Sequence, residues 1–89
     1  MSQAYRIEIL SSAAREIRTL PVPSRLRVDA CILGLAANPR PPGVKKLQGT
    51  EDLWRIRAGD YRIVYRIRDR VLCILIVRVA QRRDVYRKR

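Results

Sequence analysis

The sequence predicts a small α+β protein in which an N-terminal helical hairpin packs on one face of a mostly antiparallel sheet. Three observations support this fold class. Residues 5–10 alternate between apolar and polar side chains, two segments with helical spacing follow, and residues 54–79 form alternating or apolar runs separated by short turns. The predicted order is β-α-α-β-β-β in a single domain that spans residues 1–89, because a chain of 89 residues leaves little room for a second domain.

The first strand and the first helix are predicted near the N-terminus. Alternate positions of YRIEIL, residues 5–10, are apolar, which is typical of a strand with one buried face. In the segment SSAAREIRTLP that follows, Ser11 or Ser12 can cap a helix, and Pro21 and Pro23 end it. The predicted apolar stripe of this helix comprises Ala14, Ile17 and Leu20.

A second helix is predicted to begin after Ser24, its N-cap, and to stop at Asn38 and Pro39. Because only a few residues separate the two helices, they should form an antiparallel hairpin. A stiff loop over residues 39–43 and an irregular connection over residues 44–53 lead to the sheet. The predicted core stripe of the second helix comprises Leu26, Ala30, Leu33 and Ala37.

Three further strands complete the prediction. Residues 54–58 and 61–67 form a hairpin around Gly59-Asp60, since glycine at the first turn position permits the positive φ of a type II′ turn. After a turn at residues 68–70, the apolar run VLCILIVRV, residues 71–79, suits a central strand that is covered on both faces. The arginines of the hairpin should point to the side of the sheet away from the helices.

The charge of the chain is strongly basic and uneven. Twenty Lys and Arg against eight Asp and Glu give a net charge of +12 and a pI near 11.2. Residues 1–44 carry six Arg and three acids, net +3, whereas residues 45–89 carry fourteen Lys or Arg and five acids, net +9. Such a distribution favours RNA, DNA or an acidic protein as partner. Arginine in particular presents a planar fork that matches phosphate.

Other features exclude several classes of protein. Cys31 and Cys73 lie among apolar residues and are predicted to be reduced core thiols of a cytoplasmic protein. Two cysteines without any histidine do not suit a zinc site, and no metal or other cofactor is expected. The N-terminus has no apolar stretch of signal-peptide length, and the longest uncharged apolar run, residues 71–77, is too short to span a bilayer. No membrane partner is therefore expected.

Arginines gather on the predicted hairpin. Arg55 and Arg57 share one face of their strand, and Arg62 and Arg66 share a face of the next. If the hairpin brings these faces together, the guanidinium groups form a cluster. This cluster is interpreted either as a phosphate-binding surface or as a solvated outer face with nearby aspartates as counter-ions.

The basic tail and the connection before the hairpin have open interpretations too. In the tail, Arg82, Arg83 and Arg87 surround Tyr86, a combination that suits single-stranded nucleic acid, although Tyr86 can equally pack the tail on the sheet. Lys45 and Lys46 either contact RNA or belong to a solvated loop.

Few hydrolytic mechanisms fit this inventory of side chains. Metal-dependent cleavage needs clustered carboxylates, which the sequence does not show, and histidine-based or Cys–His catalysis is impossible without histidine. RNA cleavage by the substrate's own 2′-hydroxyl remains, because the protein then needs only to position the RNA, neutralise the transition state and assist proton transfer. Arginines suit the second task, and Tyr86 could transfer a proton if cations lower its pKa from about 10.

Two segments, KKLQGTEDLWRIRAGDYRIVYRI and VLCILIVRVAQRRDVYR, resemble the C-terminal signatures of the RelE/ParE toxin superfamily, and the resemblance covers nearly the whole chain. It implies a RelE-like fold and the toxin of a type II toxin–antitoxin system. Toxins of the RelE branch cut mRNA in the ribosomal A site through attack by the substrate 2′-hydroxyl, whereas those of the ParE branch target DNA gyrase.

The resemblance also implies roles for individual residues. The implied catalytic residues are Arg55, Arg57, Arg62, Arg82 and Tyr86, and the implied RNA contacts are Lys45, Lys46, Arg66, Gln81, Arg83 and Arg87. The sequence departs from its relatives in two places. Arg55 and Arg57 stand where some relatives have lysine, and Gln81 stands where many have histidine or lysine. Each departure removes a candidate proton carrier, so slow chemistry is expected.

The implied partners are a cognate antitoxin, mRNA and the 70S ribosome with its rRNA. An acidic or partly disordered segment of the antitoxin would wrap the toxin, and operator DNA would be reached only through the antitoxin. Three alternatives stay open: a ParE-like gyrase inhibitor, a toxin fold that binds antitoxin and RNA without cleavage, and a basic RNA-binding module without activity.

Overall fold

The structure, a computed structural model, describes residues 4–49 and 52–81. Two helices and five strands are present in this part of the chain, with a short 3₁₀ turn before the last strand. In chain order they are β1 (Arg6–Ile9), α1 (Ser11–Arg18), α2 (Val22–Ala37), β2 (Lys45–Lys46), β3 (Leu53–Ala58), β4 (Tyr61–Arg68), the turn Asp69–Val71 and β5 (Cys73–Gln81).

The strands form one sheet in the order β1-β5-β4-β3-β2. Strand β1 runs parallel to β5, and the other pairs are antiparallel, so the predicted α+β class and the mostly antiparallel sheet are confirmed. The prediction of an irregular connection over residues 44–53 was wrong in part. Lys45 and Lys46 pair with Arg55 and Trp54 and add a fifth strand, which two lysines alone do not indicate.

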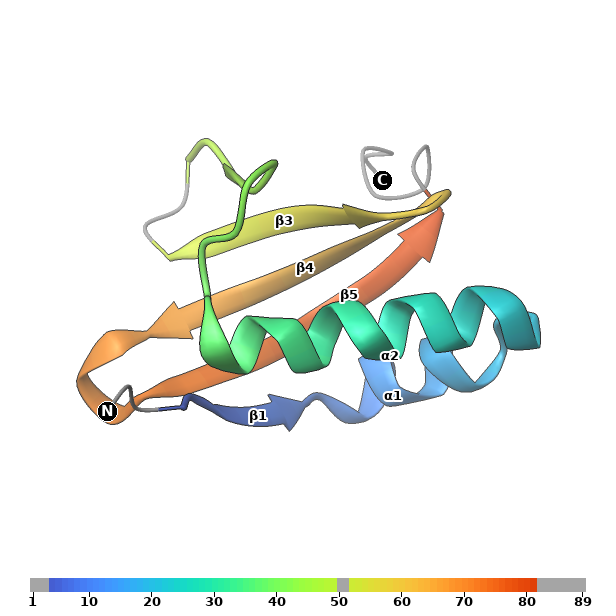
Figure 1. Ribbon diagram of the computed structural model, residues 1–89, viewed down its shortest axis with the longest axis horizontal. Helices are drawn as coiled ribbons and strands as arrows, with labels where there is room; N and C mark the ends of the chain where they lie inside the picture. Colours follow the sequence, from blue (N-terminus) through green and yellow to red (C-terminus); the bar gives the residue numbers. More distant parts are fainter. Residues whose placement is uncertain (1–3, 50–51, 82–89) are drawn as a thin grey trace.

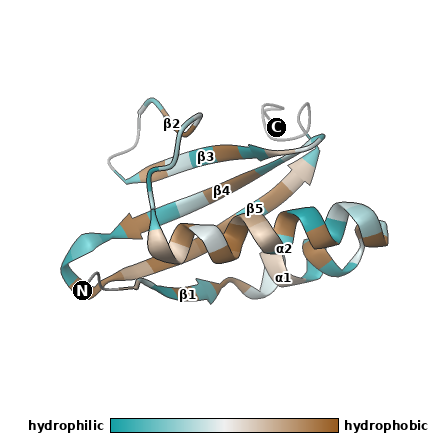
Figure 2. Ribbon diagram, in the orientation of Figure 1, coloured by the Kyte–Doolittle hydropathy of each residue, from teal (hydrophilic) through white to brown (hydrophobic). Residues whose placement is uncertain are grey.

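Both helices cover the same face of the sheet (Figure 1). The core lies between the two layers, with Val28 and Leu35 from α2 packed against residues such as Ile63, Tyr65 and Ile74 from the central strands. In Figure 2 the apolar colouring is strong along β5, whereas β1 alternates between charged and apolar residues. No helix among the described residues is long and apolar enough to cross a membrane.

The predicted start of the first helix was wrong. Ser11 is already the first helical residue, Leu10 holds the extended N-cap position, and no side chain bonds to the cap. Burial also differs from the predicted stripe, because Ala13 and Ile17 are buried while Ala14 is only half-buried. The chain enters the helix directly from β1, where the Leu10 N–H bonds to Ile76 of β5, so strand pairing sets the boundary.

The predicted cap and core stripe of the second helix were wrong as well. The helix begins at Val22, and Pro23 lies in its first turn, where a missing N–H costs nothing. Its buried residues are Val28, Ile32 and Leu35. The predicted stripe Leu26, Ala30, Leu33 and Ala37 points to solvent on the opposite side. Both sets have helical spacing, so spacing alone does not identify the buried one.

The β3–β4 hairpin has the predicted turn. Gly59 has φ 65°, and the only described non-glycine residue with positive φ is Leu72, so Asp60 keeps the ordinary sign that a type II′ turn requires. A Cβ at Gly59 would lie 2.8 Å from Nη1 of Arg27, but this flexible side chain can move, so the positive φ is the reason for glycine. The turn therefore fixes the register in which the hairpin arginines meet.

The last strand differs from the prediction in its first residue and in the burial of its two faces. It begins at Cys73, two residues later than predicted, because the 3₁₀ turn and Leu72 occupy the intervening positions. Ile74, Ile76 and Val79 are buried, but Leu75 and Val77 are half-buried, so only one face is fully covered. A register shift lies between Val64, which pairs with Arg78, and Tyr65, which pairs with Ile76.

Candidate nucleic-acid interface

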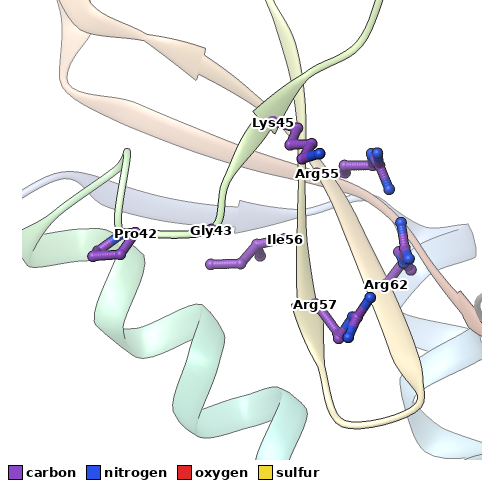
Figure 3. Close-up of a pocket in the computed structure, with 7 residues that line it drawn as sticks. All are labelled: Pro42, Gly43, Lys45, Arg55, Ile56, Arg57 and Arg62. Atoms are coloured by element: carbon purple, nitrogen blue, oxygen red, sulfur yellow. The ribbon is translucent and has the colours of Figure 1, made fainter.

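A pocket of about 460 Å³ opens where β2 begins beside β3. It is lined by Pro42, Gly43, Lys45, Arg55, Ile56, Arg57 and Arg62 (Figure 3). The loop before β2 contributes the first two of these residues, and strands β2, β3 and β4 contribute the others. The pocket thus combines side chains that lie up to twenty residues apart in the sequence.

The strand registers bring the basic residues of the pocket together. Arg57 pairs with Arg62 across the β3–β4 hairpin, and Lys45 pairs with Arg55 across β2 and β3. In Figure 3 the three arginine side chains lie on the side of β3 away from Ile56. Arg62 is only 6% exposed, so of the two interpretations of the cluster the solvated outer face is wrong for this residue.

The electrostatics of the pocket favour an anionic ligand. Four of its lining residues are cationic and none of the seven is acidic. Like charges that face one another across strands repel, and a guanidinium removed from water is costly. An oxyanion can accept hydrogen bonds from several of these groups at once, and arginine can bind phosphate through two parallel bonds. The arrangement therefore suits a phosphate of a nucleic acid.

Contacts with the core and with β4 hold the loop that forms one wall of the pocket. The hydroxyl of Tyr65, a fully buried residue, donates a hydrogen bond of 2.8 Å to the carbonyl oxygen of Pro39. Burial raises the pKa of this tyrosine above its ordinary value, so the hydroxyl stays protonated and can donate. The loop is thereby tied to the strand that also carries Arg62.

A second anchor joins the loop to the turn after β4. Nη2 of Arg40 lies 3.0 Å from Oδ2 of Asp69, and its guanidinium carbon lies 5.0 Å from the centre of the Trp54 ring. Tyr5 also donates a hydrogen bond to Asp69. The bonds from Arg40 and Tyr5 lower the pKa of Asp69, and the bond to this carboxylate raises the pKa of Tyr5. Neither Arg40 nor Trp54 was predicted as a site residue, and the proline-rich loop was the only sequence signal near Arg40.

Several residues predicted to bind RNA lie outside the pocket. Lys46 faces the other side of its strand, with Nζ 5.8 Å from the centre of the Trp54 ring. Arg66 forms an ion pair with Asp52. Gln81 lies at a separate cavity of about 300 Å³, whose lining includes Glu16 and Arg78. Four predicted residues, Arg82, Arg83, Tyr86 and Arg87, lie outside the described residues.

The described residues offer cations but few groups that exchange protons. The chain contains no histidine, and no three Cys, Asp or Glu side chains within the described ranges form a group that could hold a metal ion. Guanidinium groups stay protonated at neutral pH and act as hydrogen-bond donors. The pocket can therefore bind an anion and stabilise negative charge that develops on it.

A helical hairpin on one face of a five-stranded mixed sheet, with a basic pocket at the β2–β3 edge, defines the class of protein as the RelE/ParE toxin superfamily. Residues 7–86 match the sequence model of the family described as "ParE toxin of type II toxin-antitoxin system, parDE". The chain belongs to this family.

Relatives and solved structures agree with this assignment. Toxin RelE of Mycobacterium tuberculosis is 33% identical over 84 residues, which cover 93% of this chain and 87% of the relative. The archaeal RelE–RelB complex from Pyrococcus horikoshii contains a chain with a TM-score of 0.79 and 31% identity, with 89% of this chain and 96% of that chain covered. The RelBE2 toxin–antitoxin complex of M. tuberculosis gives a TM-score of 0.78 at 27% identity, with 89% and 99% covered.

Proposed function

We propose that this chain is a ribosome-dependent mRNA endoribonuclease, the toxin of a type II toxin–antitoxin system, which inhibits translation by cutting mRNA in the ribosomal A site. The proposal is carried by the pocket that gathers Lys45, Arg55, Arg57 and Arg62, with no acidic residue among the described residues that line it. The similarity to toxins called RelE supports this branch of the superfamily.

In the proposed reaction the substrate supplies the nucleophile. The 2′-hydroxyl loses its proton and attacks the adjacent phosphorus, the bond from phosphorus to the 5′-oxygen breaks, and the leaving oxygen takes up a proton. The products carry a 2′,3′-cyclic phosphate and a 5′-hydroxyl. Arg55, Arg57 and Arg62 stabilise the charge on the pentavalent phosphorus, while Lys45 holds the flanking backbone. Arg82 and Tyr86, outside the described residues, are proposed to assist charge stabilisation and proton transfer.

The proposed protein partner is an antitoxin encoded beside the toxin. Solved structures of relatives include complexes with a partner called RelB, from P. horikoshii and Escherichia coli. A net charge of +12 favours an acidic or partly disordered partner segment. The toxin carries out its reaction in the cytoplasm, where mRNA and 70S ribosomes are available, and contacts operator DNA only through the antitoxin.

Primer extension on a reporter mRNA tests the proposal. Purified protein is added to the mRNA with and without programmed 70S ribosomes, and cut sites are read at single-nucleotide resolution. Cuts at A-site codons that appear only with ribosomes are expected. Cuts that appear equally without ribosomes would contradict ribosome dependence, and the absence of cuts in both lanes would contradict the nuclease function.

Inhibition of DNA gyrase is the second candidate, because the matching family model describes the ParE toxin. A supercoiling assay with purified gyrase separates the two functions. Inhibition of supercoiling together with intact mRNA would favour the gyrase target. If both assays are negative while the antitoxin binds, the chain is a toxin fold that has lost cleavage.

A further inference from the structure

Helix α2 carries apolar residues on two opposite sides. One side contributes Val28, Ile32 and Leu35 to the core. At 3.6 residues per turn, another set of uncharged positions falls within about 120° of the circumference on the far side. We call this set the outer face of α2, and all its members are exposed: Val22, Pro23, Leu26, Ala30, Leu33, Gly34 and Ala37.

This outer face exposes large side chains to an unusual degree. Leu33 is 70% exposed, Leu26 is 62% exposed and Val22 is 55% exposed. Single exposed apolar residues are ordinary, but a face of four helical turns without any charge indicates a surface that another molecule covers. The feature is the more notable because almost a third of the chain is charged.

Gly34 gives an independent indication of close approach. Glycine within a helix lowers its stability relative to alanine, so such a residue needs a reason. A Cβ added to Gly34 would meet nothing within 4 Å, which means that the fold itself does not require glycine here. The backbone of a partner that approaches α2 closely would explain the missing side chain.

The spacing of the outer face identifies the shape of its partner. Leu26, Ala30, Leu33 and Ala37 follow one another at intervals of four, three and four residues. This is the spacing with which one helix packs along another. An amphipathic helix fits such a surface through its own apolar positions, as in other helix-in-groove complexes.

The charge of the protein identifies the chemistry of that helix. Arg27 borders the outer face on one side, and Arg25 and Asp29 border it on the other, on a chain of net charge +12. Glutamate or aspartate beside the apolar positions of the partner would complement this field. A second copy of the chain would instead bring two strongly positive molecules together.

We propose that the outer face of α2 is a docking surface for an acidic amphipathic helix of a different protein. The inference rests on the proposed function for the existence of a protein partner encoded beside the toxin. The outer face adds where on the toxin that partner binds and which secondary structure it uses.

The test measures binding of full-length toxin variants to the protein encoded beside the toxin gene, by isothermal titration calorimetry. The double variant Leu26→Glu/Leu33→Glu is expected to bind at least roughly 30-fold more weakly, because it removes two apolar anchors and adds repulsion. Its melting temperature should stay near that of the parent, since both residues are exposed. Val71→Glu is the matched control, because Val71 is 58% exposed but lies after β4, and its affinity should not change.

Gly34→Ala separates docking from folding. It is expected to raise the melting temperature and to weaken binding, whereas a residue with only a structural role would not move the two in opposite directions. A complex whose affinity is unchanged in the double variant overturns the inference and leaves the proposed function intact. If no complex forms, the antitoxin part of the proposed function fails together with the inference. Self-association of the toxin that depends on Leu26 and Leu33 in sedimentation velocity overturns it in favour of a second copy.

Discussion

The pocket and the outer face of α2 are two exposed surfaces of opposite character. The pocket collects four cationic side chains from three strands, whereas the outer face has seven uncharged positions on one helix. The first surface suits a ligand with fixed negative charges, and the second suits a ligand with apolar side chains. With the proposed RNA substrate and the proposed helical partner, a chain of 89 residues would bind the two on different elements.

Of the changes that distinguish the two surfaces, replacement of Arg62 should have the largest effect. Arg62→Ala is expected to lower single-turnover cleavage on the ribosome by about 10²–10³-fold, the range for the loss of a group that stabilises transition-state charge. Affinity for the antitoxin should change little if the outer face of α2 is its main anchor. The measurement is the cleavage rate in quenched-flow samples resolved on gels.

Two controls sharpen the result for Arg62. Arg70→Ala removes an exposed arginine outside the pocket lining and should leave the rate unchanged. Arg62→Lys retains the charge but not the planar fork, so its rate should lie between those of the parent and Arg62→Ala. A parental rate in Arg62→Ala would show that other groups stabilise the transition state, and the contrast between the two surfaces would lose its functional meaning.

Raising the salt concentration should weaken binding at the pocket more than binding at the outer face, and this effect should be smaller than that of Arg62→Ala. If the four pocket cations each contact an RNA phosphate, affinity for single-stranded RNA should fall roughly 50-fold between about 50 and about 200 mM salt, since the slope is about −0.7 per contact. Affinity for the acidic partner should fall less, because apolar contacts are insensitive to salt in this range. Fluorescence anisotropy at several salt concentrations measures both, and equal slopes would contradict the distinction.

Loss of the Tyr65 hydroxyl tests how far the pocket depends on the core. Tyr65→Phe leaves the Pro39 carbonyl without this donor and should lower the free energy of unfolding by about 1–2 kcal/mol. For a domain of this size each kcal/mol lowers the melting temperature by about 4–8 °C. Cleavage should also fall, but less than in Arg62→Ala, because the loop carries Pro42 and Gly43 of the pocket. Tyr61→Phe is the control, because it retains the hydrogen bond from Tyr65 to Pro39. Equal melting temperatures of the two variants would show that this hydrogen bond does not anchor the loop.

Of the two surfaces, the pocket was easier to predict from the sequence. In a strand, side chains alternate with a period of two, and the Gly59-Asp60 turn leaves one register for the β3–β4 hairpin. The pairing of Arg57 with Arg62 therefore follows from the local sequence. Burial of Arg62 does not follow from it, because burial depends on contacts between segments that are distant in the chain.

The exposure of the outer face of α2 could not be predicted in the same way. Two sets of residues in α2 have helical spacing: the outer face, and the buried set Val28, Ile32 and Leu35. Which set is buried is decided only when the helix packs on the sheet. Strand β2 was missed for a related reason, since two lysines form a strand only because β3 offers a free edge. The loop contacts of Arg40 also join segments too distant for a sequence pattern to predict.

The ion pair between Arg40 and Asp69 should have the smallest effect, since both side chains are about half exposed. Asp69→Asn is expected to lower the free energy of unfolding by about 0.5 kcal/mol at neutral pH. Because the folded state lowers the pKa of Asp69, this stabilisation is present above the unfolded pKa near 3.9 and is lost as the pH falls through the lower folded value. Urea unfolding at neutral pH and at about pH 2.5 should therefore show the parent and the variant converging in acid. A difference that persists in acid would mean that the Asp69 charge does not stabilise the loop, and that the pocket wall relies on the Tyr65 hydrogen bond and the contact between Arg40 and Trp54.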